Sequence, residues 1–336
     1  KELIVMKIFI SIASYQDPLL ESTIRSAFDN AKEPQNLIFG ICDQSHTPIN
    51  LNLFTFTDQI KYEHIDPVNS QGPCWARSRI QKLFDNEDYY LQIDSHMQFQ
   101  KNWDNFLLNY IDRIRKINRS SHQLPIISSY PRSFKIIDFE SKKFELNDQE
   151  KNTNIMTFRE DSMFQKGNYC GQVGSFISSN DISHGYLLAA GALFTSKEFV
   201  KQVPYDPKLY FYGEEMSLML RAFTRGFSIF HLPSVPIFHF YTDVEDIQRP
   251  LHWDENEDKK REIKWHQREE NGIDRLNQII NNKINGDYGL GKIRNLKDFE
   301  HLSGVDLINK VVTNKEKAFT GDFLKSIPWN KSPLNL

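Results

Sequence analysis

The sequence predicts an α/β fold in which helices flank a sheet, followed by a mainly helical C-terminal appendage. Short apolar runs alternate with amphipathic helical segments through the first third of the chain, a pattern typical of strands joined by crossover helices. Several of these runs stop at a polar residue, as buried strands do at the edge of a sheet. Beyond about Asp243 the composition becomes charged and polar. We therefore expect a main domain over residues 1–245 and an appendage over residues 246–336 that packs against it.

The first third of the chain contains four runs with the length and composition of buried strands, at residues 7–14, 37–42, 60–64 and 89–93. Apolar residues recur at helical spacing between them and after them, over residues 19–28, 76–84 and 103–117. In open α/β sheets ligands bind just outside the carboxyl ends of the strands. Asp43 and Asp94 each follow the apolar part of a strand, so both stand where a nucleotide can bind.

The rest of the chain is less regular. Residues 119–181 alternate short strand-like runs, such as 125–130, with Asn- and Ser-rich loops, and no register follows from that pattern. A helix is expected from Glu214 onward, and a longer one over residues 255–276. Further strands are expected at residues 187–194, 227–232 and 236–241.

The charge balance excludes one class of function. The formal net charge is −3 and the isoelectric point is about 6.4, so the chain lacks the positive field that nucleic-acid-binding proteins present to phosphates. No stretch approaches the roughly 20 apolar residues of a membrane-spanning helix, and Lys7 interrupts the apolar run at the start. We expect neither a nucleic-acid partner nor a transmembrane segment.

The three cysteines, Cys42, Cys74 and Cys170, are far apart and odd in number. This argues against a disulfide framework and against a zinc site built from cysteines. A reducing compartment fits best, and we expect a cytoplasmic protein.

The triplet Asp94-Ser95-His96 directly follows a predicted strand. Alternate residues of an extended chain point the same way, so Asp94 and His96 can converge on one cation. Such a ligand set, with open positions left for diphosphate oxygens, suits Mn²⁺ or Mg²⁺. A capping Asp beside a loop His is the structural alternative for so short a motif. His239, in the apolar run PIFHFY, is either a third ligand in its neutral form or a buried structural histidine.

Two further motifs carry charge at the start of a predicted helix. Glu214 and Glu215 follow Gly213, where carboxylates are ordinary helix-start residues but where Glu214 could also stabilise positive charge on a sugar. Arg77 lies in the first turn of a helix after Gly72-Pro73. A cation is disfavoured there by the helix dipole, so Arg77 either pairs with an anion such as a donor diphosphate or is a plain surface residue.

Together, the motifs LQIDSHMQFQKNWD, GPCWARSR, FYGEE and PIFHFY resemble glycosyltransferase family 60, the family of the Skp1-hydroxyproline GlcNAc-transferases. The likeness spans nearly the whole chain, and the mucin-type polypeptide GalNAc-transferases are more distantly similar. The resemblance implies a GT-A type fold, a Rossmann-like mixed sheet flanked by helices, with the catalytic domain over residues 1–245.

The resemblance also implies roles for individual residues. Metal ligation falls to Asp94, His96 and His239. Donor contacts fall to Asp43, Arg77, Asp94 and the Ala190-Gly191-Ala192 run, and we expect Glu214 and Glu215 to be catalytic. Two positions depart from the mucin-type pattern, because Tyr212 replaces the first glycine of a pair and Glu215 stands where those enzymes have Asn.

The activity that the resemblance implies is a retaining, metal-dependent transfer of GlcNAc from UDP-GlcNAc to a hydroxyl of an acceptor protein, such as a hydroxyproline, Ser or Thr side chain. The same donor site could serve transfer onto a glycan or a lipid-linked sugar of a microbial surface polymer. From a different class, a non-catalytic nucleotide-sugar-binding module could keep the fold. The residues alone leave these three readings open.

Overall fold

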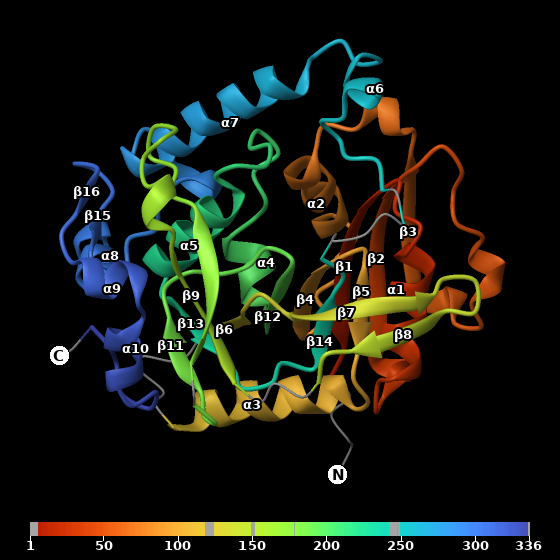
Figure 1. Ribbon diagram of the computed structural model, residues 1–336, viewed down its shortest axis with the longest axis horizontal. Coiled ribbons are helices and arrows are strands. Elements are labelled where there is room, and N and C mark those ends of the chain that lie inside the picture. Colours follow the sequence, from red (N-terminus) through yellow and green to blue (C-terminus); the bar gives the residue numbers. More distant parts are fainter. Residues whose placement is uncertain are drawn as a thin grey trace.

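The computed structural model describes residues 6–117, 124–148, 152–177, 179–241, 247 and 249–334. Its centre is a mixed eight-stranded sheet with the order β11-β13-β6-β12-β4-β1-β2-β3 (Figure 1). The strands are β1 Ile8–Tyr15, β2 Leu37–Gln44, β3 Ile60–Ile65, β4 Tyr89–Asp94, β6 Leu124–Ser128, β11 Ser183–Gly185, β12 Ala192–Ser196 and β13 Phe227–His231. The four strands predicted in the first third of the chain, β1 to β4, pair in parallel, which confirms the α/β prediction.

Helices cover both faces of this sheet, because side chains along a strand alternate between the faces. On one face Ile8, Ile10 and Ile12 of β1 pack in the same apolar cluster as Leu20 of α1 and Trp103 of α3. On the other face Phe9 belongs to the cluster that contains the apolar side of α2. These helices are α1 Leu20–Asp29, α2 Pro73–Gln81 and α3 Trp103–Ile117.

A smaller four-stranded sheet, of order β5-β14-β7-β8, brings two distant parts of the chain together. Its strands are β5 Met97–Phe99, β7 Arg132–Asp138, β8 Lys143–Leu146 and β14 Ile237–His239. Because β14 runs antiparallel to β5 with His239 opposite Met97, His239 lies next to His96. The Phe240 amide donates to the His96 carbonyl over 3.0 Å and fixes this register.

The remaining elements come from residues 153–326 of the chain. They are β9 Thr153–Phe158, β10 Gln172–Ile177, α4 Glu198–Gln202, α5 Glu214–Thr224, α6 Glu255–Asp258, α7 Trp265–Ile280, α8 Leu296–Ser303, β15 Val305–Asp306, β16 Val311–Val312, α9 Lys315–Phe319 and α10 Asp322–Ser326. Leu276 of α7 and Phe299 of α8 are buried in the same core as Leu220 of α5. The C-terminal helices thus share the main core, while the predicted boundary at 245/246 falls on residues outside the described ranges.

Two predicted elements are wrong in extent. The strand expected over 187–194 begins only at Ala192, because the preceding residues form a buried turn in which the Ala192 amide donates to the Ala189 carbonyl. Burial on all sides gave this turn the apolar composition of a strand.

The helix expected over 255–276 is two helices, α6 and α7. Between them the Lys264 ammonium donates to the carbonyl of Arg261, and the Asp258 carboxylate accepts from the Trp265 amide at the start of α7 over 2.8 Å. These side chains end one helix and begin the next, which apolar spacing does not reveal.

Within the described ranges, no helix is both long and apolar enough to cross a membrane. Cys42, Cys74 and Cys170 are all buried and unpaired.

Candidate metal centre and active site

Two pockets meet at Asp94, at the carboxyl end of β4. The larger pocket, of about 370 Å³, is lined by residues of α2, α5 and β10 and by the 189–191 turn. The smaller pocket, of about 180 Å³, is lined by the ends of β1 and β4 and by the segment Arg249 to Trp253. Asp94, Pro73 and Phe211 line both. The position matches the general rule that ligands bind outside the carboxyl ends of strands.

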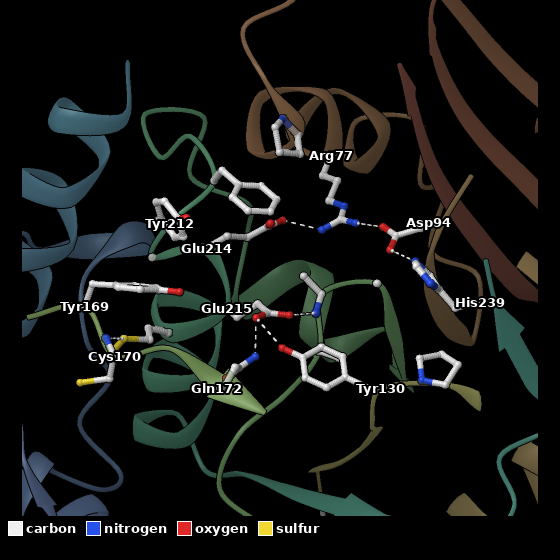
Figure 2. A pocket seen from close by; sticks show the side chains of 18 of the residues that line it. Arg77, Asp94, Tyr130, Tyr169, Cys170, Gln172, Tyr212, Glu214, Glu215 and His239 are labelled. Atoms are coloured by element: carbon white, nitrogen blue, oxygen red, sulfur yellow. Dashed lines mark hydrogen bonds and ion pairs between the residues drawn. The ribbon is translucent and has the colours of Figure 1, made fainter. Parts of the chain in front are cut away.

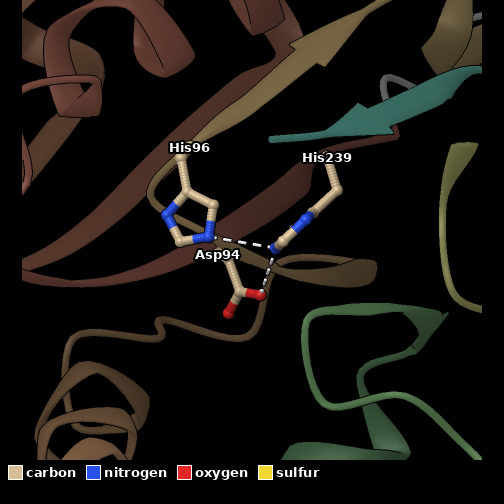
Figure 3. Close-up of side chains that lie close together, drawn as sticks. All are labelled: Asp94, His96 and His239. Atoms are coloured by element: carbon tan, nitrogen blue, oxygen red, sulfur yellow. Dashed lines mark hydrogen bonds and ion pairs between the residues drawn. The ribbon is translucent and has the colours of Figure 1, made fainter. Parts of the chain in front are cut away.

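Asp94, His96 and His239 converge at this junction, with ligand atoms that all lie within 4.8 Å of one another (Figure 3). His96 Nε2 is 3.0 Å from His239 Nε2, and His239 Nε2 is 3.3 Å from Asp94 Oδ2. Metal bonds of about 2.1 Å at right angles place two ligand atoms about 3 Å apart. The observed separations therefore suit one divalent cation held on one face by three ligands, with further positions open.

The protonation of this cluster also suits a cation. Burial lowers the pKa of His239 below its ordinary value, so the imidazole is neutral near pH 7 and has a lone pair for a metal. Burial raises the pKa of the Asp94 carboxyl, but His239, Arg77 and His96 outweigh it and hold that pKa below its ordinary range. Asp94 is therefore an anion.

Arg77 ties the metal cluster to the start of α5. Its guanidinium donates to Asp94 Oδ1 over 2.7 Å and to Glu214 Oε1 over 2.5 Å. Figure 2 shows the resulting row of side chains, Glu214, Arg77, Asp94 and His239, along one side of the larger pocket. Because Arg77 takes Oδ1, Asp94 keeps Oδ2 for a cation. Of the two roles that the sequence left open for Arg77, that of a plain surface residue is wrong, because Arg77 is buried. Its partners in the structure are two carboxylates of the protein itself.

Glu214 and Glu215 occupy different surroundings in the larger pocket. Glu214 is 4% exposed and also accepts from the Tyr205 hydroxyl over 2.9 Å, so its carboxylate is firmly held. Glu215 accepts from the Ala190 amide over 2.8 Å and from the side chain of Gln172 (Figure 2). Burial, opposed by the Ala190 hydrogen bond and reinforced by the charge of Glu214, raises the pKa of Glu215 to about 7. Such a carboxyl changes charge near neutral pH.

The turn at 189–191 is part of the same wall. Ala190 and Gly191 line the larger pocket, and the Gly191 carbonyl accepts from the Asp94 amide over 3.3 Å. A Cβ at residue 191 would lie 2.3 Å from Asp94 Oδ2. An added Cβ would therefore force the carboxylate or the turn to shift. Ala190 and Gly191 thus line the pocket beside Asp94, and their contact with a donor stays a prediction.

Asp43 is the predicted site residue that the structure sets apart. Its side chain is 2% exposed and lines neither pocket. It accepts from the Tyr62 hydroxyl over 2.6 Å and from the Ile49 amide over 3.2 Å. The next residue, Gln44, lines the smaller pocket instead. A contact between Asp43 and a nucleotide therefore stays a prediction.

The sequence matches the family model described as "Glycosyltransferase (GlcNAc)" over residues 7–51 and 45–309. These segments hold every residue of the metal centre. The chain belongs to this GlcNAc glycosyltransferase family. As a glycosyltransferase of this family it is an enzyme, and the match confirms the resemblance found from the motifs. No curated protein matches the chain.

One solved structure shows the fold of this glycosyltransferase. A crystal structure of GalNAc-T7 with UDP, GalNAc and Mn²⁺ superposes with a TM-score of 0.56 at 12% identity, over 95% of this chain and 55% of that one. The fold is therefore of the GT-A type, and the chain spans just over half the length of that relative. A Staphylococcus aureus TarS fragment in complex with UDP-GlcNAc superposes with a TM-score of 0.48 at 13% identity, over 96% of this chain and 76% of that one.

Two charged residues of the glycosyltransferase site were missed from the sequence. Asp17 Oδ2 accepts from His96 Nδ1 over 2.7 Å, and Arg249 donates to the same oxygen over 3.4 Å. Asp17 stands just after β1, as Asp94 ends β4, so the rule that selected Asp43 and Asp94 could have found it. Arg249 follows residues outside the described ranges, and no sequence signal marks it.

Proposed function

We propose that the chain transfers GlcNAc from UDP-GlcNAc to a hydroxyl of an acceptor, with retention at the anomeric carbon and with a divalent cation held by Asp94, His96 and His239. One observation carries the proposal: the three ligand atoms stand where two pockets of different size meet. A nucleotide sugar has its diphosphate between a nucleoside and a sugar, and so has the shape of this junction. Membership of the GlcNAc glycosyltransferase family supports GlcNAc as the transferred sugar.

In this arrangement the nucleoside occupies the smaller pocket and the sugar and acceptor occupy the larger one. The smaller pocket offers an aromatic ring, Trp253, and a cation, Arg249, which suit a base and a phosphate. The larger pocket offers the tyrosines Tyr130, Tyr169 and Tyr212 and the carboxylate of Glu215, which suit the apolar faces and hydroxyls of a sugar.

Mn²⁺ fits the ligand set better than Mg²⁺ does, because Mg²⁺ favours oxygen ligands and two of the three ligands here are imidazole nitrogens. When bound, the cation would neutralise charge on the diphosphate leaving group. That GalNAc-T7 was crystallised with Mn²⁺ supports this choice.

The protein's own residues position the reactants. In the proposed transfer the bond from the anomeric carbon to the UDP oxygen breaks, the acceptor oxygen bonds to that carbon on the same face, and the hydroxyl proton passes to the departing phosphate. Glu214 anchors Arg77 and through it Asp94. Glu215, in the wall of the larger pocket, is the carboxyl we propose to orient the sugar or the acceptor hydroxyl.

The acceptor that we propose is a protein hydroxyl, on hydroxyproline, Ser or Thr, and a cytoplasmic location agrees with three unpaired cysteines. Transfer onto a glycan or a lipid-linked sugar of a surface polymer is the competing acceptor class. Incubation with hydroxyproline, Ser and Thr peptides and with glycans, followed by mass spectrometry, separates the two. A mass gain only on the glycans would contradict the protein acceptor.

The donor reaction is tested by UDP release from a panel of nucleotide sugars, with Mn²⁺ and with EDTA. We expect release from UDP-GlcNAc that requires Mn²⁺ and that Asp94→Ala abolishes. His301→Ala, which changes an exposed histidine of α8, is the matched control and should keep the full rate. Binding of UDP-GlcNAc without turnover would instead identify a nucleotide-sugar-binding module. Proton NMR of the product reports whether the anomeric configuration is retained.

A further inference from the structure

One buried carboxylate, that of Asp17, contacts His96 but is not itself one of the three candidate metal ligands. Asp17 lies between β1 and α1, and its side chain is 4% exposed. Oδ2 accepts from His96 Nδ1 over 2.7 Å, from Ser95 Oγ over 2.8 Å and from Arg249 over 3.4 Å. Oδ1 accepts from the Leu19 amide over 2.9 Å.

We propose that Asp17 is a positioning residue of the metal centre, which holds the hydrogen of His96 on Nδ1 and so leaves the Nε2 lone pair directed at the cation. The proposal deepens the proposed function and rests on it for the role of His96. An ionised carboxylate can only accept hydrogen bonds, so the His96 nitrogen that faces Asp17 must carry the hydrogen. In a neutral imidazole the other nitrogen then has the lone pair.

The second histidine has no such partner on its Nδ1. That atom of His239 is buried and makes no hydrogen bond to any described residue, whereas Asp94 Oδ2 lies 3.3 Å from His239 Nε2 and favours the hydrogen on that nitrogen. His96 Nε2 is 3.0 Å from His239 Nε2. With the hydrogen of His96 on Nδ1, only His239 can donate across that distance before a metal binds. The two histidines therefore differ. His96 already has the tautomer that binds a cation, whereas His239 must change its tautomer when the cation binds.

Asp17→Asn tests this idea because asparagine keeps the shape of the side chain but replaces one of the two accepting oxygens by an NH₂ group, which only donates. If the amide oxygen faces Leu19 N–H, as Oδ1 does now, then the amide NH₂ faces His96 Nδ1 and drives its hydrogen to Nε2. If the amide is flipped, NH₂ meets the Leu19 N–H and two donors oppose each other. Each arrangement penalises the tautomer that binds metal.

The experiment has two readouts that do not depend on sugar transfer. Long-range ¹H–¹⁵N spectra of histidine-labelled, metal-free protein at about pH 8, well above the ordinary pKa of a histidine side chain, report the tautomer of His96, assigned by its absence in His96→Ala. We expect an Nδ1–H signal in the wild type and a shift toward Nε2–H in Asp17→Asn. Electron paramagnetic resonance of free Mn²⁺ should show affinity lowered by roughly 10–100-fold in Asp17→Asn.

Asp104→Asn is the matched control, because Asp104 is also a buried carboxylate, 2% exposed, and accepts from the Lys32 and Glu33 amides. It should bind Mn²⁺ as the wild type does. An Nε2–H tautomer of His96 in the wild type would overturn the proposal without any variant, as would unchanged Mn²⁺ affinity in Asp17→Asn. If Asp94→Ala also leaves Mn²⁺ affinity unchanged, the metal centre and the proposed function fail; if only Asp17→Asn is silent, the role of Asp17 alone fails.

Discussion

The Asp94 carboxylate lies against the backbone of Gly191, so close that a Cβ there would stand 2.3 Å from Oδ2. Gly191→Ala must therefore displace Asp94, the proposed metal ligand, or the turn that carries residue 191. Because a shift of about 1 Å in a reacting group can cost on the order of 100-fold in rate, we expect a loss of that order in UDP release. The same variant should bind Mn²⁺ more weakly.

Gly286→Ala is the control for this variant. Gly286 has a positive φ of +73°, a conformation that favours glycine, but no atom lies within 4 Å of its added Cβ. It should lose some stability and keep its Mn²⁺ affinity and rate. Equal rates for Gly191→Ala and the wild type would show that Asp94 is not where catalysis needs it.

Arg77 is expected to be the largest electrostatic contribution to the stability of the site. Its side chain and that of Glu214 are each 5% exposed, so Arg77→Met leaves two carboxylates near a pocket wall without their counter-charge. Breaking such a buried pair costs about 3–5 kcal/mol of unfolding free energy, which urea denaturation measures. Arg79→Met is the control on the same helix, because the pair of Arg79 with Glu63 is 33% and 27% exposed and is worth about 0–1 kcal/mol. Similar losses in the two variants would contradict the account.

Glu215 should make stability depend on pH. Its pKa is raised from 4.5 to about 7, so between these values the native protein holds a proton that the unfolded chain has released. The stability that this group contributes is complete below about pH 4.5 and is lost as pH rises through about 7.

Glu215→Gln has no carboxyl at this position, so it should not show this loss of stability as pH rises. Relative to the wild type, its unfolding free energy should rise by up to about 3 kcal/mol between these limits, as measured by urea denaturation in EDTA at a series of pH values. A difference between the two proteins that is flat with pH would show that the Glu215 carboxyl titrates at its ordinary pKa.

Trp253 should report on nucleotide binding. It lines the smaller pocket and packs against Phe211 with ring centroids 5.1 Å apart. Loss of an aromatic ring that stacks on a base costs about 1–3 kcal/mol, so Trp253→Ala should weaken UDP binding roughly 5- to 150-fold by calorimetry. Trp75→Ala removes an indole that lies under the Arg79 guanidinium instead and should leave the affinity for UDP unchanged. Equal effects of the two substitutions would place the nucleoside elsewhere.

The sequence predicts the parallel core and selects Asp94 and His96 as candidate metal ligands, because both depend on local pattern. Buried strands are continuous apolar runs, and Asp94 and His96 lie on one short segment. For His239 the sequence left two roles open, metal ligand and buried structural residue, because an apolar strand suits both equally. Its place beside His96 follows from the pairing of β14 with β5, which joins residues about 140 positions apart and leaves no local signal.

Two kinds of feature could not be predicted from the sequence, each for a physical reason. The buried turn at Ala189 to Gly191 has the composition of a strand, because burial on all sides selects apolar residues in either conformation. The contact of Asp17 with His96 depends on how α1 packs against β5 and the residues just before it, where the Thr23 hydroxyl donates to the Ser95 carbonyl over 2.7 Å. Such packing is tertiary, and helical periodicity says only which face of α1 is buried.

We propose that Asp94, His96 and His239 hold the cation that binds the donor diphosphate. Anomalous diffraction at the manganese edge, from crystals grown with UDP and Mn²⁺, tests it directly. We predict one peak within bonding distance, about 2.1–2.3 Å, of Asp94 Oδ2 and both Nε2 atoms, in contact with the UDP diphosphate. A manganese peak on the diphosphate that none of these three side chains reaches would contradict the account.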